Sequence, residues 1–427
     1  MSADLAVAGK ALAAACGAVR EGADSDAVDG LVPGFVASPG STQEASSLLR
    51  AAAEHDLAVV PRGAGSRMLW GVPPSRCDLL VDTRRMASVA EHAAGDLVAR
   101  VQAGALMGDV LAALACAGQE IALDVPAGAT VGGVVASGLC GPRRLRYGSP
   151  RDLLIGITIV RADGTVAKSG GKVVKNVAGY DLGKLFAGSA GTLGLITEAT
   201  FRLHPLPGAH AWVSRTFLEG TAAAEVEALV AAAANSPLVA SAVELRRQAP
   251  GGPVSMSVLL EGSADGVAAR AGQLAGQLAE LLGGSGAMEV SPEPPAWWPG
   301  AIESGGGTLV RVSFWVSGLA LVLDAIDVAA RDASIAPDVY GSAGAGVLYL
   351  ACGPGAEVPR FVGALRAELA GTRGGVIVLA APAAVREALA QDGGMAGTVP
   401  SLGLMRAVKD QFDPGDRMAP GRFPDGI

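Results

Sequence analysis

The residues best suited to chemistry lie in three glycine-rich segments before residue 200. These segments are Pro61–Ser66, Gly128–Gly138 and Gly188–Gly194. Small residues allow successive backbone N–H groups to converge on one anion. The first segment follows a short apolar stretch that predicts a strand, and Ser66 adds a hydroxyl donor. A pyrophosphate would suit this loop, and a plain glycine turn is the alternative.

The second segment predicts the start of a helix. Thr130 can cap a helix that begins near Val131, and the N-terminus of such a helix would present N–H donors to a phosphate or a flavin carbonyl. Gly132 and Gly133 would allow the backbone to contact a flat ligand. A close contact between this helix and a sheet is the alternative reason for the glycines.

Polar side chains precede the third segment. Lys172, Lys175, Asn176 and Tyr180 lie in an otherwise apolar stretch, which is unusual for a core segment, and a solvated hairpin is the alternative. Neither the G-x-G-x-x-G dinucleotide fingerprint between a strand and a helix nor the G-x-x-x-x-G-K-[ST] P-loop occurs. The sequence therefore argues against a Rossmann-type NAD site and against a P-loop.

The composition excludes several classes of protein. The chain has 427 residues, too many for one ordinary domain, and its hydrophobic fraction of 50% supports a large core. A net charge of −8 and an aromatic content of 4% argue against a nucleic-acid partner. The five cysteines are scattered with no CxxC pair, so we expect neither a disulfide framework nor an iron–sulfur cluster in this chain.

The sequence contains no targeting or membrane-spanning signal that we can identify. The N-terminus lacks the basic start and the continuous apolar stretch of a signal peptide. The longest apolar runs, such as Val376–Val385, reach about half of the roughly 20 residues that a membrane-spanning helix needs. We therefore expect a cytoplasmic protein without direct membrane insertion, which would meet the inner face of the membrane only through partners.

The predicted elements that position the glycine-rich segments lie before Pro205–Gly208, and the pattern of strands and helices changes after this segment. Before this boundary, short strands and helices follow in an α+β pattern, with a hairpin predicted around Asp163 and Gly164. After it, two rounds of strands and helices indicate two split β-α-β units, which predicts a large antiparallel sheet with helices on one face. A last helix is predicted over Leu404–Phe412, and such tails commonly pack back on the first domain.

Five segments, in this order and spacing, resemble the FAD-binding domain of the vanillyl-alcohol oxidase/p-cresol methylhydroxylase (PCMH) superfamily. They are Arg62–Ser66, Ala129–Gly141, Pro142–Asp152, Gly171–Leu185 and Gly188–Glu198. Two stretches, Ser137–Arg144 and Lys175–Leu182, are similar in particular to the FAD-binding subunits of bacterial glycolate oxidases. The resemblance is strong over about residues 35–205, weak through the second domain, and moderate at Phe412–Pro414 and Pro420–Phe423.

The resemblance implies an α+β fold with a two-subdomain, PCMH-type FAD-binding domain and a cap domain. We expect an N-terminal helical segment at 1–34 and the FAD-binding domain at 35–207. The cap or substrate domain of two split β-α-β units would span 208–400, and a C-terminal segment at 401–427 would return to the FAD-binding domain.

By the same resemblance, the glycine-rich segments would bind different parts of FAD. The pyrophosphate would be held by Arg62, Gly63, Ala64, Gly65 and Ser66. The ribityl chain and the isoalloxazine edge would be lined by Ala129, Thr130, Gly132, Gly133, Ser137 and Gly138. The adenosine part would contact Gly194 and Ile196, and the cleft wall would be shaped by Tyr147, Gly148 and Asp152. Lys175 or Lys172 would place positive charge near the pyrimidine ring of the flavin.

The sequence departs from the family pattern in its histidines. Ser66, Arg67 and Met68 occupy the stretch where many members attach FAD covalently through a histidine, so we predict non-covalent FAD. The 217 residues after His210 (427 − 210) contain no histidine. We therefore expect neither a histidine base in the cap domain nor a metal site.

No catalytic residue is assigned from the sequence. The candidates are Tyr180, Tyr147 and Lys175, while Tyr340, Tyr349 and Arg311 are the cap residues that remain for binding a carboxylate. Core or surface roles are the alternative for these three cap residues.

The resemblance implies an FAD-binding subunit of a glycolate-oxidase-type complex that oxidises small 2-hydroxy acids. A homologous FAD-containing subunit would carry out substrate chemistry, and an iron–sulfur subunit would take the electrons. One alternative is a self-sufficient FAD-dependent dehydrogenase or oxidase for a 2-hydroxy acid, such as glycolate or D-lactate, or for an alcohol. Another is a non-catalytic scaffold with a flavin-binding fold.

Overall fold

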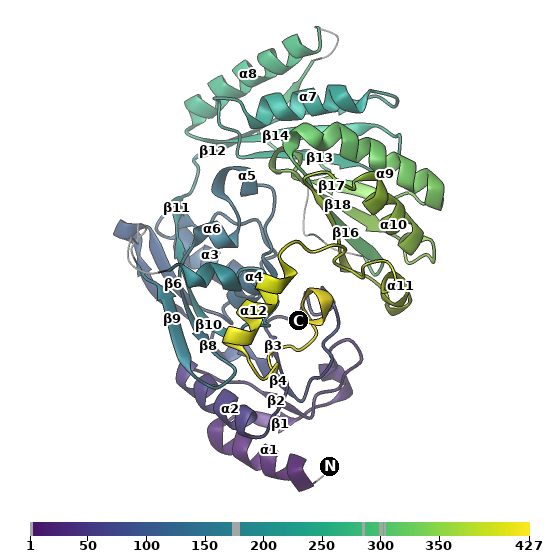
Figure 1. Cartoon of the computed structure of the whole chain (residues 1–427). Coiled ribbons are helices and arrows are strands. Elements are labelled where there is room, and N and C mark those ends of the chain that lie inside the picture. The colour runs from purple at the N-terminus through teal and green to yellow at the C-terminus, as the bar shows by residue number, and fades with distance from the viewer. Residues whose placement is uncertain (1–2, 173–179, 284–286, 299–301, 303–304) are drawn as a thin grey trace. The chain divides into compact units, whose positions relative to one another are not determined.

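The computed structural model describes residues 3–172, 180–283, 287–298, 302 and 305–427 (Figure 1). The chain divides into two compact units. Unit 1 comprises Met1–Cys140, Ser149–Leu206 and Val399–Ile427, and unit 2 comprises Gly141–Gly148 and Pro207–Thr398. The division at Leu206 and Pro207 lies within the proline-rich segment that the sequence offered as a boundary. The assignment of Gly141–Gly148 to unit 2 differs from the domain limits that the sequence suggested.

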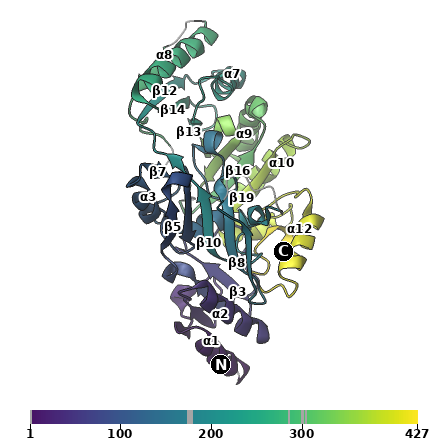
Figure 2. The same ribbon diagram turned by 90° about the vertical axis from the view of Figure 1, so that its left-hand side faces the viewer.

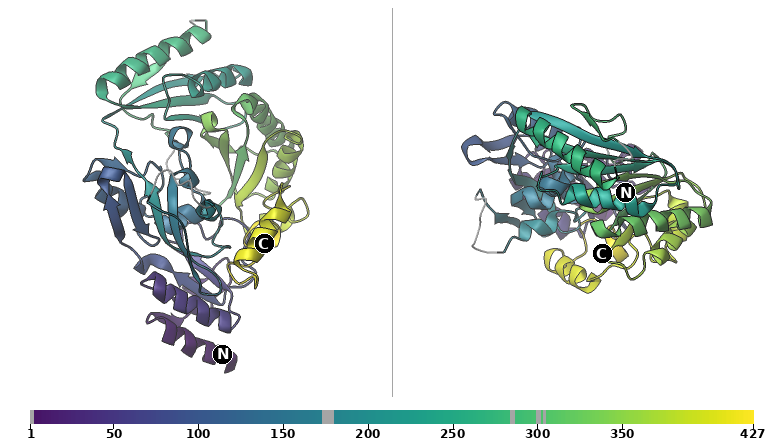
Figure 3. Two further views of the ribbon diagram at one scale, coloured as in Figure 1. Left: turned by 60° about the vertical axis from the view of Figure 1, so that its left-hand side comes forward. Right: turned by 90° about the horizontal axis from the view of Figure 1, so that it is seen from above.

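A four-stranded sheet forms the first part of unit 1. Its order is β1 (Val19–Glu21), β2 (Phe35–Ala37), β4 (Leu79–Asp82) and β3 (Val59–Arg62). β2, β4 and β3 are parallel, and β1 is antiparallel to β2, so residues 1–34 are built into this unit. Helices α1 (Ala3–Ala15) and α2 (Thr42–Glu54), the two purple helices near the N-terminus, pack side by side (Figure 3).

A five-stranded antiparallel sheet forms the second part of unit 1. Its order is β5 (Val89–Ala93), β6 (Val98–Gln102), β10 (Leu195–Arg202), β8 (Leu154–Val160) and β9 (Val166–Gly170), with β10 beside β8 in Figure 2. The predicted hairpin is confirmed, because Val160 pairs with Val166 and Gly164 turns the chain at φ +81°. The predicted α+β fold with a two-part domain is thus present.

Short helices of unit 1 pack against this second sheet or return to the unit from the end of the chain. They are α3 (Met107–Ala115), α4 (Val131–Ser137), α6 (Pro150–Leu153) and α12 (Leu402–Phe412), and two short strands, β7 (Gln119–Glu120) and β11 (His204–Pro205), form a separate pair. The apolar side chains of α3, α4 and β10 share one buried core. No helix in the described part of the chain combines the length and apolar character that crossing a membrane requires.

Unit 2 is built on one eight-stranded antiparallel sheet, as the sequence predicted. The strand order is β15-β12-β14-β13-β17-β18-β16-β19. The strands are β12 (Ala209–Phe217), β13 (Ala242–Arg247), β14 (Val254–Gly262), β15 (Glu289–Ser291), β16 (Thr308–Ser313), β17 (Asp338–Gly341), β18 (Val347–Cys352) and β19 (Gly375–Ala380). Each half of the sheet is one split β-α-β unit, and the halves join where β13 pairs with β17.

Four helices cover one face of this sheet (Figure 1). They are α7 (Ala223–Ala234), α8 (Ala264–Leu281), α9 (Leu319–Ala333) and α10 (Val358–Glu368). Strand residues alternate between the two faces, so Val310 and Val312 of β16 enter the core under the helices, whereas Arg311 between them lies on the opposite face. The alternation therefore separates a helix-covered face from a second face that carries polar side chains.

The C-terminal segment extends the first sheet of unit 1. Met418 forms a parallel bridge with Val59 at the outer edge of β3. The N–H of Val59 donates to the carbonyl of Arg417 at 2.7 Å, and the N–H of Ala419 donates to the carbonyl of Val59 at 2.8 Å. Because β3 leads directly into the first glycine-rich segment, the end of the chain supports the base of that loop.

Candidate functional site

The three glycine-rich segments meet in unit 1. A β-carbon on Gly63 would lie 2.0 Å from Thr130 Oγ1, so the first segment touches the second with no space for a side chain. The N–H of Gly188 donates to the carbonyl of Val135 at 2.9 Å, which joins the third segment to α4. A β-carbon on Gly191 would lie 3.3 Å from Pro61, so the third segment also lies next to the first. Segments far apart in sequence therefore form one backbone-lined site.

The first loop leaves a run of donors available. Within the described part of the chain, the backbone N–H groups of residues 63–66 donate to no protein acceptor. Gly65 has φ +81°, a left-handed conformation that turns adjacent N–H groups toward one point. Ala64 and Ser66 are exposed. A cradle of this kind fits the pyrophosphate of a dinucleotide.

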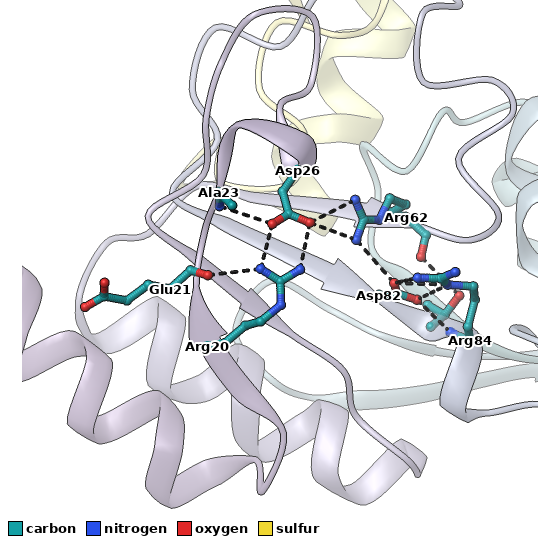
Figure 4. Close-up of polar contacts among 8 residues, drawn as sticks. Arg20, Glu21, Ala23, Asp26, Arg62, Asp82 and Arg84 are labelled. Atoms are coloured by element: carbon teal, nitrogen blue, oxygen red, sulfur yellow. Dashed lines mark hydrogen bonds and ion pairs between the residues drawn. The ribbon is translucent and has the colours of Figure 1, made fainter.

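The Arg62 side chain has a different role from its neighbours. Its guanidinium lies 3.4 Å from Asp26 and 3.3 Å from Asp82, and these contacts connect β3 and β4 with the 3₁₀ helix Asp24–Asp26 (Figure 4). The hydrogen bond from Arg20 lowers the pKa of Asp26 against the opposing effect of burial, so this carboxylate stays ionised. The charge of Arg62 is therefore engaged by two aspartates, and the loop would bind an anion through its backbone.

The second segment forms a helix start, as predicted. Thr130 caps α4, and its Oγ1 accepts a hydrogen bond from the N–H of Gly133 at 3.3 Å. A β-carbon on Gly132 would lie 2.8 Å from the Ala103 side chain, so close packing against the sheet explains this glycine. The Ser137 hydroxyl donates to the carbonyl of Gly133 at 2.7 Å. Gly133 is exposed, whereas Ala129 and Thr130 are buried beneath it.

The remaining predicted cofactor residues occupy several environments. Gly194 lies against β8, because a β-carbon there would be 2.9 Å from the carbonyl of Val160, and Ile196 is buried in β10. Asp152 accepts from the backbone and hydroxyl of Ser149 at 2.8 Å and is exposed. Tyr147 and Gly148 belong to unit 2.

The residues between β9 and the third segment give limited support to a catalytic role. The side chain of Tyr180 is almost fully exposed, at 90%. The ammonium group of Lys172 is 2.6 Å from Glu91, which offsets its charge, and both side chains reach solvent. Lys175 lies outside the described residues.

Tyr147 is held by a buried carboxylate within unit 2. Its hydroxyl donates to Glu261 Oε2 at 3.2 Å, and Arg143 lies 3.3 Å from the other carboxylate oxygen. The Glu261 side chain is only 1% exposed. Burial and the charge of Glu261 raise the pKa of Tyr147 to about 12. Tyr147 therefore keeps its proton at neutral pH, which weakens its candidacy as a base.

The structure places one histidine of unit 2 beside a buried carboxylate, while the expectation that the cap domain has no histidine base stays a prediction. His210 is the second residue of β12 and belongs to unit 2. Its Nε2 lies 3.5 Å from Glu261 Oε1, and its ring stacks on Trp212 with a centroid distance of 5.8 Å. A carboxylate close to a partly exposed imidazole can take part in proton transfer.

The three residues that the sequence left as candidates for binding a carboxylate are neighbours in the sheet of unit 2. Tyr340, Tyr349 and Arg311 are on neighbouring strands of the sheet, where Tyr349 pairs with each of the other two. Among the residues that the structure describes, no three His, Cys, Asp or Glu side chains are grouped so that they could hold a metal ion.

Comparison with known proteins identifies the cofactor class of unit 1. Residues 33–170 match the family described as "FAD binding domain". Over 178 residues the chain is 35% identical to glycolate oxidase subunit GlcD of Bacillus subtilis (strain 168), which covers 41% of this chain and 38% of that protein. Over 185 residues it is 36% identical to a D-lactate dehydrogenase of Archaeoglobus fulgidus, covering 40% and 38%. These matches span less than two fifths of each relative.

Solved structures extend the likeness to the whole fold. The structure of p-cresol methylhydroxylase with substrate bound superposes with a TM-score of 0.74 at 16% identity and covers 99% of this chain and 97% of that one. Chitooligosaccharide oxidase gives a TM-score of 0.68 at 16% identity, covering 98% and 99%. The chain thus contains an FAD-binding domain in a fold of the p-cresol methylhydroxylase type, which confirms the fold and cofactor predicted from the sequence.

Proposed function

We propose that this chain is an FAD-dependent oxidoreductase component that acts on small 2-hydroxy acids, as the FAD-binding subunit of a glycolate-oxidase-type complex. The observation that carries the proposal is the meeting of the three glycine-rich segments. It places unpaired N–H groups of residues 63–66 beside Thr130 in the matched FAD-binding domain. The names of the relatives support the substrate class, since they include a glycolate oxidase subunit and D-lactate and D-2-hydroxyglutarate dehydrogenases.

The residues of this chain would bind and orient rather than react covalently. The loop at 63–66 would hold the pyrophosphate through its backbone, and the surface around Gly133 would meet the flat ring system. Bound FAD supplies a two-electron acceptor for the carbon that carries the substrate hydroxyl. Ser66, Arg67 and Met68 offer no histidine for attachment, so FAD would be held non-covalently.

The cysteines of the chain do not form a cluster within the described residues. Cys16, Cys77, Cys140 and Cys352 are buried and Cys116 is exposed, and they are scattered through the sequence. Burial raises the pKa of Cys77 and of Cys352 to about 12, so these thiols stay protonated at neutral pH. We further propose that an iron–sulfur partner takes the electrons and that a homologous flavin subunit carries out the substrate chemistry, as the resemblance to glycolate oxidase subunits implies.

The pair of Glu261 and His210 favours a second candidate, a self-sufficient hydroxy-acid dehydrogenase. Oxidation of a hydroxyl group requires a proton acceptor, and an imidazole close to a buried carboxylate could serve as one. In this version, the chain would oxidise glycolate or D-lactate without a homologous flavin subunit.

One set of measurements separates these functions. The chain is purified alone and with proteins captured from its native host, and flavin and iron are quantified. Flavin bleaching by glycolate or D-lactate is then followed without oxygen. Bleaching only with the captured partners supports the subunit, and bleaching of the chain alone supports the self-sufficient enzyme. A protein that takes up no FAD would be a scaffold and would sink the proposal.

A further inference from the structure

Four polar residues form a row across the sheet of unit 2. Arg246 of β13 pairs with Tyr340 of β17, Tyr340 pairs with Tyr349 of β18, and Tyr349 pairs with Arg311 of β16. Directly opposite residues in antiparallel strands have β-carbons about 4.5–5.5 Å apart, so their side chains leave the sheet side by side. The row lies on the face opposite the four covering helices, since Val310 and Val312 on either side of Arg311 are in the core.

The rings of the two tyrosines at the centre of the row pack against each other. Their ring centroids are 5.9 Å apart, and Tyr349 is only 6% exposed. Arg144 of helix α5 (Arg144–Tyr147) approaches from the same face and donates from Nη2 to the Tyr349 hydroxyl at 3.0 Å. A second guanidinium is thus fixed beside the phenol that faces Arg311.

The two arginines of the row differ in how their charges are balanced. Arg246 pairs with Asp338 at 3.0 Å. Arg311 is half-buried, and no carboxylate in the described part of unit 2 forms an ion pair with it. A cation that is partly removed from water without a counter-charge favours binding of an anion. The end of the row at Arg311 therefore carries excess positive charge next to phenol hydroxyls.

We propose that Arg311, with Tyr349 and Tyr340, forms the subsite for the carboxylate of the substrate. A guanidinium matches a carboxylate in a planar, two-bond geometry, and neighbouring phenols supply further polar contacts. The identity of the carboxylate as that of a 2-hydroxy acid rests on the proposed function. The subsite makes the protein selective for acids over the corresponding alcohols and amides, because a neutral group gains nothing from the Arg311 charge.

The first test measures binding without turnover. Oxalate is titrated into the FAD-loaded protein, in its complex where one forms, by calorimetry. Arg311→Met is expected to weaken oxalate binding by roughly 10- to 100-fold, the range for loss of a hydrogen bond to a charged group. Arg311→Lys should recover part of the affinity. Arg246→Met is the matched control, because it removes a charge from the same row that Asp338 already balances, and it should change the affinity less than about 3-fold.

The second test measures selectivity. The wild type should prefer glycolate to glycolamide, and Arg311→Met should raise KM for glycolate far more than it lowers kcat, which reduces that preference. Equal oxalate affinity in the wild type and in Arg311→Met, or no oxalate binding by the wild type, would overturn the subsite. Where Arg311→Met fails to fold, Arg311→Lys and Tyr349→Phe carry the comparison. The two proposals can fail separately. If oxalate binding depends on Arg311 but no hydroxy acid reduces the flavin, the proposed function is refuted and the carboxylate subsite is retained.

Discussion

At the scale of single residues, the contact between Gly63 and Thr130 sets the geometry of the candidate flavin site. A methyl group at residue 63 would be 2.0 Å from Thr130 Oγ1, closer than any real contact. Gly63→Ala should therefore displace the loop and lower retained FAD at least about 10-fold, a cost of some 1.4 kcal/mol or more in binding. The ratio of flavin to protein after gel filtration measures this. Gly95→Ala is the control, because nothing lies near its added methyl group.

The raised pKa of Tyr147 predicts how stability changes at alkaline pH. Its pKa is raised to about 12 in the folded protein, so the folded state holds its proton more tightly than the unfolded chain does. The resulting contribution to the free energy of unfolding is present below a pH of about 10, the ordinary pKa of a tyrosine. It is lost as the pH rises toward 12. Urea unfolding at pH 9 and pH 11.5 should show a smaller alkaline loss of stability in Tyr147→Phe than in the wild type. Equal losses in the two proteins would contradict this assignment.

Residue types in the sequence identified the loops but not all of their roles. The N–H groups of residues 63–66 could be inferred from small residues after a strand. The two aspartates that engage Arg62 could not, because Asp26 and Asp82 are distant in sequence. The contact between His210 and Glu261 could not be inferred either, since Glu261 is 51 residues away (261 − 210) on a neighbouring strand. Long-range pairing of this kind leaves no local signal.

At the scale of elements, helix α12 is tied to the third glycine-rich segment by one buried lysine. Lys409 Nζ donates to the carbonyl of Thr192 at 3.0 Å, to Asp413 at 2.7 Å and to the carbonyl of Met418 at 2.9 Å. Lys409→Met would leave the Asp413 carboxylate buried without its cation, so we expect a loss of about 3–5 kcal/mol in unfolding free energy.

Urea unfolding curves measure this loss. The double variant Lys409→Met with Asp413→Leu should lose less stability than Lys409→Met alone, because the uncompensated charge is gone. Leu404→Ala, on the same helix and 67% exposed, is the control and should change stability little. A Lys409→Met protein as stable as the wild type would show that the buried contacts are dispensable.

Secondary structure was predictable where burial follows a simple period. The strands of unit 2 alternate between a helix-covered face and a polar face, and this alternation is visible in the sequence. The start of β13 at Ala242 is not visible in this alternation, because the apolar Val239 before it takes a left-handed φ of 56° and is exposed.

At the scale of the whole molecule, the C-terminal segment supports the FAD-binding unit. Residues 417–419 pair with the edge of β3, and the buried Arg422 guanidinium donates to the carbonyls of Met68 and Trp70 just after the first loop. A protein that ends at Pro400 should therefore lose FAD and unfold at lower temperature. Flavin content and a thermal melt followed by circular dichroism test this. A truncated protein with full flavin content would show that the loop needs no such support.

The path of the chain through the two units has a consequence for engineering and for descent. The chain passes between them at residues 140–141, 148–149, 206–207 and 398–399. Exchanging the cap for that of another flavoprotein therefore demands two grafts, and the octapeptide Gly141–Gly148 must travel with the larger piece that contacts it. A recombination event that exchanged only Pro207–Thr398 would separate Arg144 from its partner Tyr349 and Tyr147 from its partner Glu261. The contacts of unit 2 therefore depend on a short segment that lies, in the sequence, between two parts of unit 1.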